Sequence, residues 1–462
     1  MIWIWRWIVF SLTIICLTSC AVYRPEPLDQ SSVDVALKPP SMKAVRLEAE
    51  KIQHPLIKPL LFDDRDGLSP EEAAVMAVIV NPRLRAIRDQ RGLASAQLLE
   101  AGILPNPQIS YSLDFPSGAN PGGLVNAYGL GMSWEITSLI ARSAKINAAK
   151  AHVTSVDLDI AWQEWQVAQA AKLHVYRLAS ARQQVELARE VEKRLEENAS
   201  LIQKAAAMHN KTDIDLAAAE VSRQQAQAAR LVLEREVNTE SLGLNVALGL
   251  PPDQEVTLQG NINPALMMKN HPPTSAELLN TLEDNRLDLL ALKTGYQSQE
   301  ATLRAAVRSQ FPKINLGFTR SRDTSDITTS GFGVTIDLPF FDRNQGKIAL
   351  EKATRQQLFD EYVARVAEAR AEVTRIVSDS ESVQRQLKAA EETVPALERL
   401  VKAYEKALST GNVDIPSYYE IRNNLTMKRL EIIKLQQDLM DLSVALEIAS
   451  GRSSVTSALE GS

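Results

Sequence analysis

Apolar and polar residues alternate in two pairs of short segments, one pair within 107–137 and the other within 312–339. Small or polar residues stand between the apolar ones. A period of two puts one face of a β-strand against an apolar medium and the other against a polar one. Four amphipathic strands are therefore predicted, with these apolar positions: Ile109, Tyr111, Leu113 and Phe115; Leu130, Met132, Trp134 and Ile136; Ile314, Leu316 and Phe318; Phe332, Val334, Ile336 and Leu338.

Each strand pair is followed by a long stretch of helical character. Neither proline nor glycine interrupts residues 138–208, and some 70 residues at 1.5 Å each would reach on the order of 100 Å. Apolar residues there recur at alternating spacings of three and four, which is typical of coiled coils. We expect Pro395 to kink the second long helix. The predicted helical regions are 73–101 and 276–309 before the strand pairs and hairpins at 138–250 and 343–450 after them, with turns at 208–213 and 409–414.

The two halves of the chain repeat each other at a separation of roughly 200 residues. The matching segments are Pro107-Gln-Ile109 and Pro312-Lys-Ile314, Gly129-Leu-Gly131 and Gly331-Phe-Gly333, Arg142 with Lys145-Ile146 and Arg343 with Lys347-Ile348, and Asp213-Ile214 and Asp414-Ile415. This pattern predicts a tandem duplication. Repeat 1 covers 66–260 and repeat 2 covers 276–451, with a linker at 261–275 and a tail at 452–462.

The N-terminus resembles the leader of a bacterial lipoprotein. An apolar stretch too short to span a bilayer precedes Leu17-Thr-Ser-Cys20, a small-residue cleavage site that ends in cysteine. The resemblance implies a signal peptide at 1–19, acyl groups on Cys20 and, because Ala21 follows, sorting to the outer membrane. A plain secretory signal with an incidental cysteine is the alternative. Residues 20–65 contain many prolines, and we expect this segment to form an extended arm.

The four predicted strands need an apolar medium on one face, and further strands if they are to form a closed barrel. No segment after the leader offers eighteen consecutive apolar residues, so a membrane-spanning form would have to use strands. A half-buried soluble sheet would also alternate, but the flanking segments are long helices. The smallest membrane barrels have about eight strands, so four cannot close, whereas three chains would supply twelve.

Composition and charge exclude several classes of function. The net charge of -6, with both signs interspersed, leaves no basic face for nucleic acid. No phosphate-binding loop, dinucleotide fingerprint or nucleophile elbow is present. The five histidines are scattered without metal-ligand spacing: His54, His152, His174, His209 and His271. We therefore expect no enzyme activity, no cofactor and no metal site.

The predicted hairpin turns hold the candidate functional residues. In an assembly with three-fold symmetry, the turn carboxylates would form rings around a narrow opening, which favour cations and raise the barrier for anions. Acidic residues at the start of a helix also complement its dipole, and this alternative stays open. The candidate gate consists of Asp213, Asp215 and Asp414, with Lys211, Tyr404 and Arg422 as residues that hold it closed.

Three segments resemble the opening signature of the TolC family of outer-membrane factors. They are Leu68-Ser-Pro-Glu-Glu-Ala-Ala, Asn81-Pro-Arg-Leu-Arg-Ala and Ala101-Gly-Ile-Leu-Pro105-Asn106-Pro107. The resemblance implies a mainly α fold with a small transmembrane β part. It also implies a homotrimer with a twelve-stranded outer-membrane barrel, continuous with a twelve-helix periplasmic barrel. The family's second turn has a later carboxylate where this chain has Pro416-Ser-Tyr-Tyr419, so the gate residues remain a hypothesis.

By this resemblance, the chain is expected to be the outer-membrane component of a tripartite efflux system for drugs or metal ions. Its partners would be a periplasmic adaptor protein, an inner-membrane pump of the RND type and outer-membrane lipid. A duct for type I protein secretion is the alternative within the family. A periplasmic coiled-coil adaptor or scaffold lipoprotein is the alternative from another class.

Overall fold

The computed structural model describes residues 21–63, 65–117, 122–260, 262, 274–410 and 412–453. The predicted signal peptide, Cys20, most of the linker and most of the tail lie outside these residues. The chain divides into two units, Met1–Pro40 and Ser41–Ser462, which are described separately.

The segment expected to be an extended arm contains two helices, so this expectation was wrong in part. In the first unit, α2 (Gln30–Leu37) begins after Asp29, whose carboxylate accepts a hydrogen bond from the Ser32 amide at 2.7 Å. In the second unit, α3 (Met42–Ala49) begins after Ser41, which caps it in the same way. A side-chain cap satisfies one of the free amides of a first turn, which helps a short helix to form despite the nearby prolines.

The helical stretch expected before the first strand pair is two helices, α4 (Pro70–Val80) and α5 (Pro82–Gly102). Asn81 ends the first and caps the second by accepting a hydrogen bond from the Arg83 amide at 2.9 Å. Proline disfavours helical geometry at the residue before it, so Asn81-Pro82 breaks the helix. The corresponding stretch of repeat 2 is also divided, into α9 (Ser275–Asn280), α10 (Leu282–Asn285) and α11 (Leu287–Arg308).

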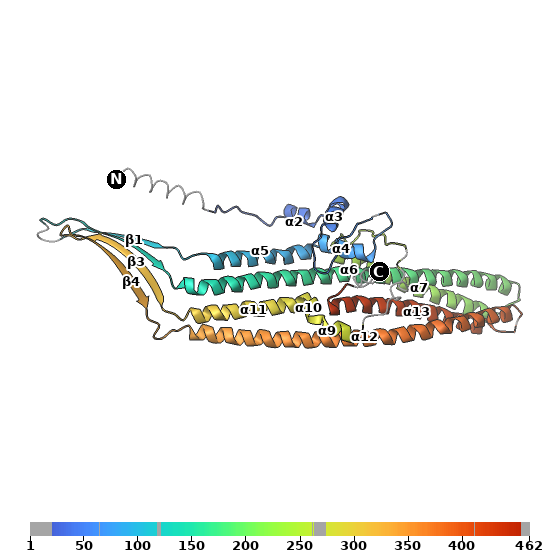
Figure 1. Ribbon diagram of the computed structural model, residues 1–462. Coiled ribbons are helices and arrows are strands. Elements are labelled where there is room, and N and C mark those ends of the chain that lie inside the picture. Colours follow the sequence, from blue (N-terminus) through green and yellow to red (C-terminus); the bar gives the residue numbers. More distant parts are fainter. Residues whose placement is uncertain are drawn as a thin grey trace. The chain divides into compact units, whose positions relative to one another are not determined.

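The alternating segments form one antiparallel sheet in the order β1-β2-β3-β4. Its strands are β1 (Gln108–Asp114), β2 (Ala127–Glu135), β3 (Lys313–Arg322) and β4 (Thr328–Asp337). Because β2 pairs with β3, the sheet joins the two repeats. Each repeat contributes one two-stranded hairpin to it (Figure 1).

Four long helices follow the strands as two hairpins. α6 (Ser138–Ala207) turns into α7 (Asp213–Leu248), and α12 (Gln345–Ser409) turns into α13 (Ile415–Ser450). Both turns lie at the helix ends remote from the sheet (Figure 1). α12 continues through Pro395. None of the helices in the described ranges is both long enough and apolar enough to cross a membrane.

The returning helices of the two repeats end in the same way. Gly249 follows α7 and Gly451 follows α13, and both adopt the left-handed conformation, with φ of 70° and 67°. A Cβ at Gly249 would lie 2.8 Å from Asn81 Cα, and one at Gly451 would lie 2.7 Å from the Asn285 carbonyl oxygen. Each returning helix therefore ends against the break between the shorter helices of its own repeat. Glycine permits both the turn and the close approach.

The apolar core lies around the middle of α6. Ala171, Val175 and Leu178 pack with α4 and with the end of α7, while Trp162 and Trp165 pack with Leu84 and Leu287. The guanidinium of Arg286 lies 5.1 Å from the centre of the Trp162 ring. Since α6 contacts elements of both repeats, it is the helix around which the two halves assemble.

Candidate functional site

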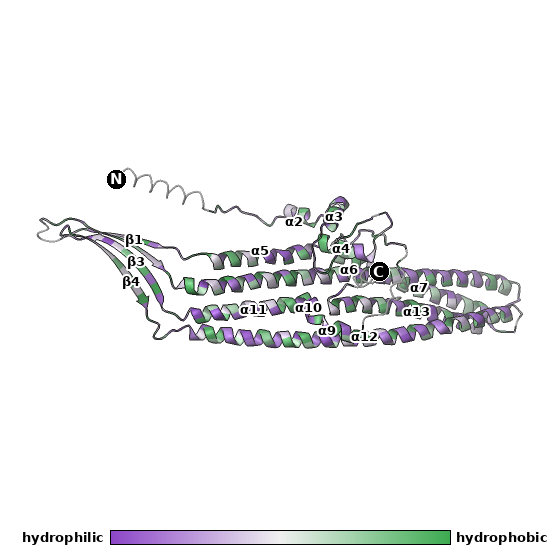
Figure 2. Ribbon diagram, in the orientation of Figure 1, coloured by the Kyte–Doolittle hydropathy of each residue, from purple (hydrophilic) through white to green (hydrophobic). Residues whose placement is uncertain are grey.

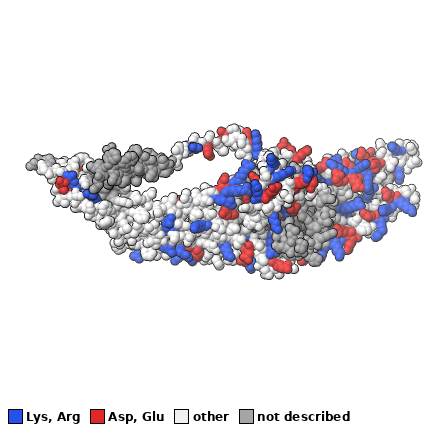
Figure 3. All heavy atoms as spheres, turned by 45° about the horizontal axis from the view of Figure 1, so that its top comes forward, with Lys and Arg blue, Asp and Glu red and all other residues white. Residues whose placement is uncertain are grey.

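One face of the sheet is apolar and exposed. Ile109, Met132, Phe318 and Phe332 form a row across all four strands, and Trp134, Leu316 and Val334 form the next. Phe332 is 91% exposed and Ile109 is 72% exposed. Hydrophobic residues recur along the strands (Figure 2), whereas the helices carry many charged residues of both signs (Figure 3). An exposed apolar surface of this kind indicates contact with a membrane or with another chain.

The opposite face of the sheet carries small and polar residues. Ser110, Gly131, Thr319 and Gly331 lie in one row across the strands. A Cβ at Gly131 would lie 2.5 Å from the Ser110 hydroxyl oxygen, so a larger side chain there would force its neighbour to move. The alternation seen in the sequence thus separates an apolar face from a face suited to water.

The sheet has two open edges within the described part of the chain. β1 pairs only with β2, and β4 pairs only with β3. An edge strand exposes unpaired backbone amides and carbonyls, and hydrophobic edges readily pair with another chain. Both edges are therefore available for pairing with another chain.

The turn carboxylates of the candidate gate serve as helix caps. Asp215 exchanges hydrogen bonds with Thr212, whose hydroxyl accepts from the Asp215 amide at 3.1 Å. Asp414 accepts from the Ser417 amide at 3.0 Å, and Asp213 is the first residue of α7. Hydrogen bonds from Thr212 and Ser417 hold the pKa values of Asp215 and Asp414 below their usual range. Both groups therefore remain negatively charged at neutral pH.

The charges of the two turns influence one another. Lys211 lowers the pKa of Asp215, and the negative charge of Asp414 opposes that effect. Carboxylates from both hairpins thus lie within electrostatic reach inside one chain. This arrangement is compatible with capping and with an electrostatic role at an opening, so capping alone does not exclude the gate hypothesis.

The other two candidate gate residues pack within the helices. Tyr404 contacts an apolar cluster that contains Leu195, Ile415 and Tyr418. Arg422 donates a hydrogen bond to the Tyr418 hydroxyl at 2.6 Å, and its guanidinium lies 5.8 Å from the centre of that ring. These contacts stabilise the start of α13 rather than tie it to a turn carboxylate.

Sequence analysis missed Tyr418 and Tyr419 as functional candidates. They are 2% and 8% exposed and pack against Leu195, Ala199 and Ala219 of the first hairpin. Burial raises the pKa of Tyr419 to about 12, and its hydroxyl has no hydrogen-bond partner among the described residues. The adjacent pair of tyrosines was visible in the sequence, but the helices that bury them come from the other repeat.

A row of polar contacts joins α6 to α13 nearer the middle of the helices. Lys172 Nζ lies 3.1 Å from Glu447 Oε2, and both side chains are buried. The next two contacts join Arg177 Nε to Asp441 Oδ2 at 3.0 Å and Ser180 Oγ to Gln437 Oε1 at 3.1 Å. Buried charges must find partners, so this row fixes the register between the two hairpins.

The described residues hold no obvious metal site. Within those ranges, no group of three or more His, Cys, Asp or Glu side chains is arranged to bind an ion. His54 and His174 instead make structural contacts, with the Ala161 carbonyl and with Glu240. The features that stand out are the apolar sheet face, its open edges and the charged turns.

Solved structures of outer-membrane channels share this fold. CusC matches with a TM-score of 0.71 at 17% identity, over 87% of this chain and 99% of that chain. CmeC of Campylobacter jejuni matches with a TM-score of 0.71 at 16% identity, over 96% of this chain and 97% of that chain. MtrE of Neisseria gonorrhoeae, in an open state, matches with a TM-score of 0.64 at 16% identity, over 87% of this chain and 97% of that chain. By sequence, none of the curated proteins gives a significant match.

The fold is thus the mainly helical fold of outer-membrane channel subunits, as the sequence predicted. The family model described as "Outer membrane efflux protein" matches residues 278–452, which cover nearly all of repeat 2. The predicted resemblance to the outer-membrane factors is confirmed by this match together with the shared fold.

Proposed function

We propose that this chain is one subunit of a passive exit duct in the outer membrane, in a tripartite system that exports small molecules such as drugs or metal ions. The observation that carries the proposal is the four-stranded sheet, apolar on one face and polar on the other, which continues into long helical hairpins. Lipid on the apolar face and water on the polar face would satisfy both.

The open edges support a trimer. If β4 of one chain pairs with β1 of the next, the backbone groups at both edges gain partners. Three chains would then close a twelve-stranded barrel, with the long helices continuing as a twelve-helix barrel in the periplasm. A lipid anchor at Cys20 would add a second attachment to the membrane.

The partners follow from the absence of an energy source in the proposed duct. A periplasmic adaptor and an inner-membrane pump of the RND type would supply directed transport. Among the described residues, no contact favours a type I protein-secretion duct over small-molecule export. An adaptor or scaffold is less well supported, because adaptors carry one helical hairpin, whereas this chain has two, each following a strand pair.

Opposite faces of β4 allow a sharp test of membrane insertion. Phe332 belongs to the apolar face and Thr335 to the polar face of the same strand. Phe332→Lys would place a charge against lipid, which costs about 2–4 kcal/mol at the middle of a bilayer, whereas Thr335→Lys would face water. The wild type and Thr335→Lys should both insert into planar bilayers and conduct ions.

Phe332→Lys should insert into the bilayer and conduct ions much less than the wild type or Thr335→Lys. Circular dichroism of both variants in detergent provides the control for helix content. Equal channel formation by the two lysine variants, or no conductance by the wild type, would contradict the proposed function.

A further inference from the structure

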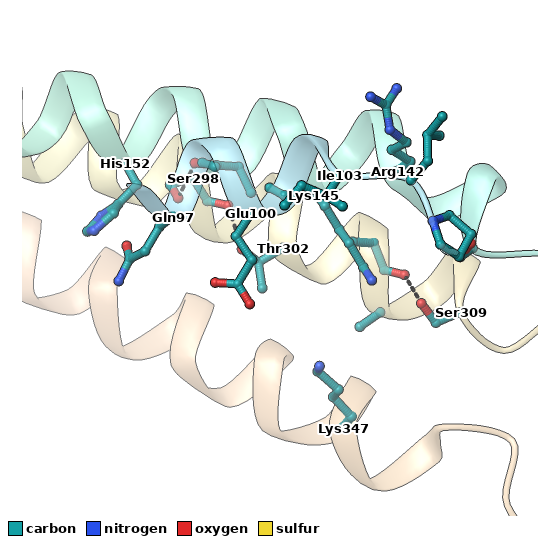
Figure 4. Close-up of a pocket in the computed structure, with 18 residues that line it drawn as sticks. Gln97, Glu100, Ile103, Arg142, Lys145, His152, Ser298, Thr302, Ser309 and Lys347 are labelled. Carbon is teal, nitrogen blue, oxygen red and sulfur yellow. Dashed lines mark hydrogen bonds between the residues drawn. The ribbon is translucent and has the colours of Figure 1, made fainter. Parts of the chain in front are cut away.

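A groove of about 720 Å³ lies where the helices meet the strands (Figure 4). All four junctions between helix and strand contribute to its lining. Ile103, Leu104 and Pro105 come from the link between α5 and β1, and Ser138 from the start of α6. Ser309 follows the end of α11, and Lys347 lies near the start of α12.

Two lysines from equivalent positions of the repeats line this one groove. Lys145 is on α6 and Lys347 on α12, and both side chains point into the space between those helices (Figure 4). Among the residues that the structure describes, neither ammonium group forms an ion pair, in contrast to Lys172, Lys428 and Lys434. The duplication has thus brought two lysines, each without an ion pair among the described residues, to one groove.

Three of the other polar side chains of the groove are engaged in hydrogen bonds to the backbone. Arg142 donates to the Gly102 carbonyl through Nε at 3.1 Å, which caps the end of α5. The hydroxyls of Ser298 and Ser309 donate to the backbone carbonyls of Ala148 and Ala305, both at 2.8 Å. Gln97 and His152 also line the groove, and Lys145 and Lys347 are the lysine donors that can reach a ligand there.

The groove also has an apolar rim. Ile103 and Leu104 are 62% and 49% exposed beside the cationic centre. Glu100 is the one carboxylate among the lining residues, against the three cations Arg142, Lys145 and Lys347. A ligand that fits this lining would carry an anionic head for the lysines and an apolar part for Ile103 and Leu104.

We infer that this groove is a binding site for an amphiphile whose phosphate head group carries a net negative charge and lies between Lys145 and Lys347. Charge-assisted hydrogen bonds from two ammonium groups give the site its preference for anions. The amphiphile comes either from the membrane, as an anionic phospholipid, or from solution. The inference concerns binding alone and does not depend on channel activity.

The probe is hexyl phosphate, measured by equilibrium dialysis against the full chain in phosphatidylcholine nanodiscs. Hexyl glucoside has the same alkyl chain without charge and is the matched ligand control. Wild-type protein should bind hexyl phosphate, and added salt should weaken the binding by screening. Lys145→Gln with Lys347→Gln should weaken it about a hundredfold or more, since each of the two lost charged hydrogen bonds costs about tenfold or more in affinity.

Two single variants sharpen the test. Lys150→Gln removes a cation from the same helix outside the groove, so it should leave the affinity unchanged. Glu100→Gln removes the competing negative charge and should tighten binding. If hexyl phosphate binds the double lysine variant as well as the wild type, or if hexyl glucoside binds equally well, the inference is wrong.

The source of the amphiphile is tested by adding phosphatidylglycerol to the nanodiscs. If the lipid occupies the groove, hexyl phosphate should bind more weakly there in the wild type but not in the double variant. If the occupant comes from solution, the affinity should be the same in both nanodiscs. Either result, with the lysine dependence intact, supports the site.

Discussion

At the scale of single residues, His54 shows how burial fixes a protonation state. Its side chain is 2% exposed, and its Nε2 lies 2.9 Å from the Ala161 carbonyl oxygen. The backbone amides of Leu56 and Ile57 each donate to Nδ1 at 3.0 Å. Only the neutral ring, with its proton on Nε2, can make all three bonds. Burial lowers the pKa of His54, and the nearby charges of Glu164 and Arg88 act in opposite directions.

We therefore expect acid to loosen the segment that His54 holds on α6. Because the folded pKa lies below the value of 6.5 for an exposed histidine, the stabilisation is present above about pH 6.5 and is lost as the pH falls through the folded pKa. Amide exchange of Leu56 and Ile57, corrected for intrinsic rates, should lose at most about 1.4 kcal/mol of protection per pH unit. The Glu72 amide, which donates to the Ser69 hydroxyl, is the control. Protection that stays constant from pH 7.5 to 5 would contradict this assignment.

Local chemistry also determined which residues could be identified from the sequence. The capping roles of Asp215 and Asp414 follow from acidic residues directly after a turn, and this was the stated alternative to a gate. The burial of Tyr418 and Tyr419 was not predictable, because the surfaces that cover them come from residues more than 190 positions earlier, such as Leu195 and Ala219.

At the scale of elements, periodicity indicated the helices and strands but not the breaks between helices. Asn81-Pro82 interrupts a stretch whose composition otherwise favours a continuous helix, and Gly249 of α7 packs against that interruption. The two helices at 30–37 and 42–49 were missed because their stabilising caps are single residues among prolines. The contact row between α6 and α13 could not be derived from either helix alone.

The hairpin turns carry the electrostatic prediction. Since Asp414 caps α13, a substitution by alanine would remove the negative charge and the helix cap together, and the two effects could not be separated. Asn caps as well as Asp, so Asp213→Asn with Asp414→Asn should remove charge and keep the fold. We expect a higher single-channel conductance and a lower permeability ratio of cations to anions than in the wild type.

Asp253→Asn, in the exposed loop after α7, is the matched control and should leave both quantities unchanged. The gate hypothesis fails if the double variant has the conductance and ion selectivity of the wild type. Circular dichroism should give the same helix content for all three proteins.

At the scale of the whole molecule, the proposed channel requires the sheets of several chains. The apolar face of the sheet is exposed and both edges are open, although the strands themselves are fully paired inside the sheet. The sequence could predict this requirement, because four strands are too few to close a barrel. The number of chains that complete it was inferred from the family resemblance, since no residue pattern within one chain specifies a neighbour.

Cysteine cross-linking of the two edges tests the central claim most directly. Ser110 lies on β1, and the polar-face positions of β4 are Thr329, Gly331, Gly333 and Thr335. Within one chain, three inter-strand spacings separate β1 from β4, or about 14 Å, which is too far for a disulfide. Variants that combine Ser110→Cys with a cysteine at each of these positions should form disulfides only between chains.

For at least one of the four β4 positions, oxidation of the membrane-inserted protein should give covalent dimers and trimers and nothing larger. As a control, Ser110→Cys with Gly131→Cys places the two cysteines on adjacent strands of one chain. Their disulfide should form within the chain, so the protein should remain monomeric, and its formation shows that oxidation took place. If this control disulfide forms but none of the four edge pairs cross-links, or if the largest product is not a trimer, then the sheets do not close into a three-chain channel.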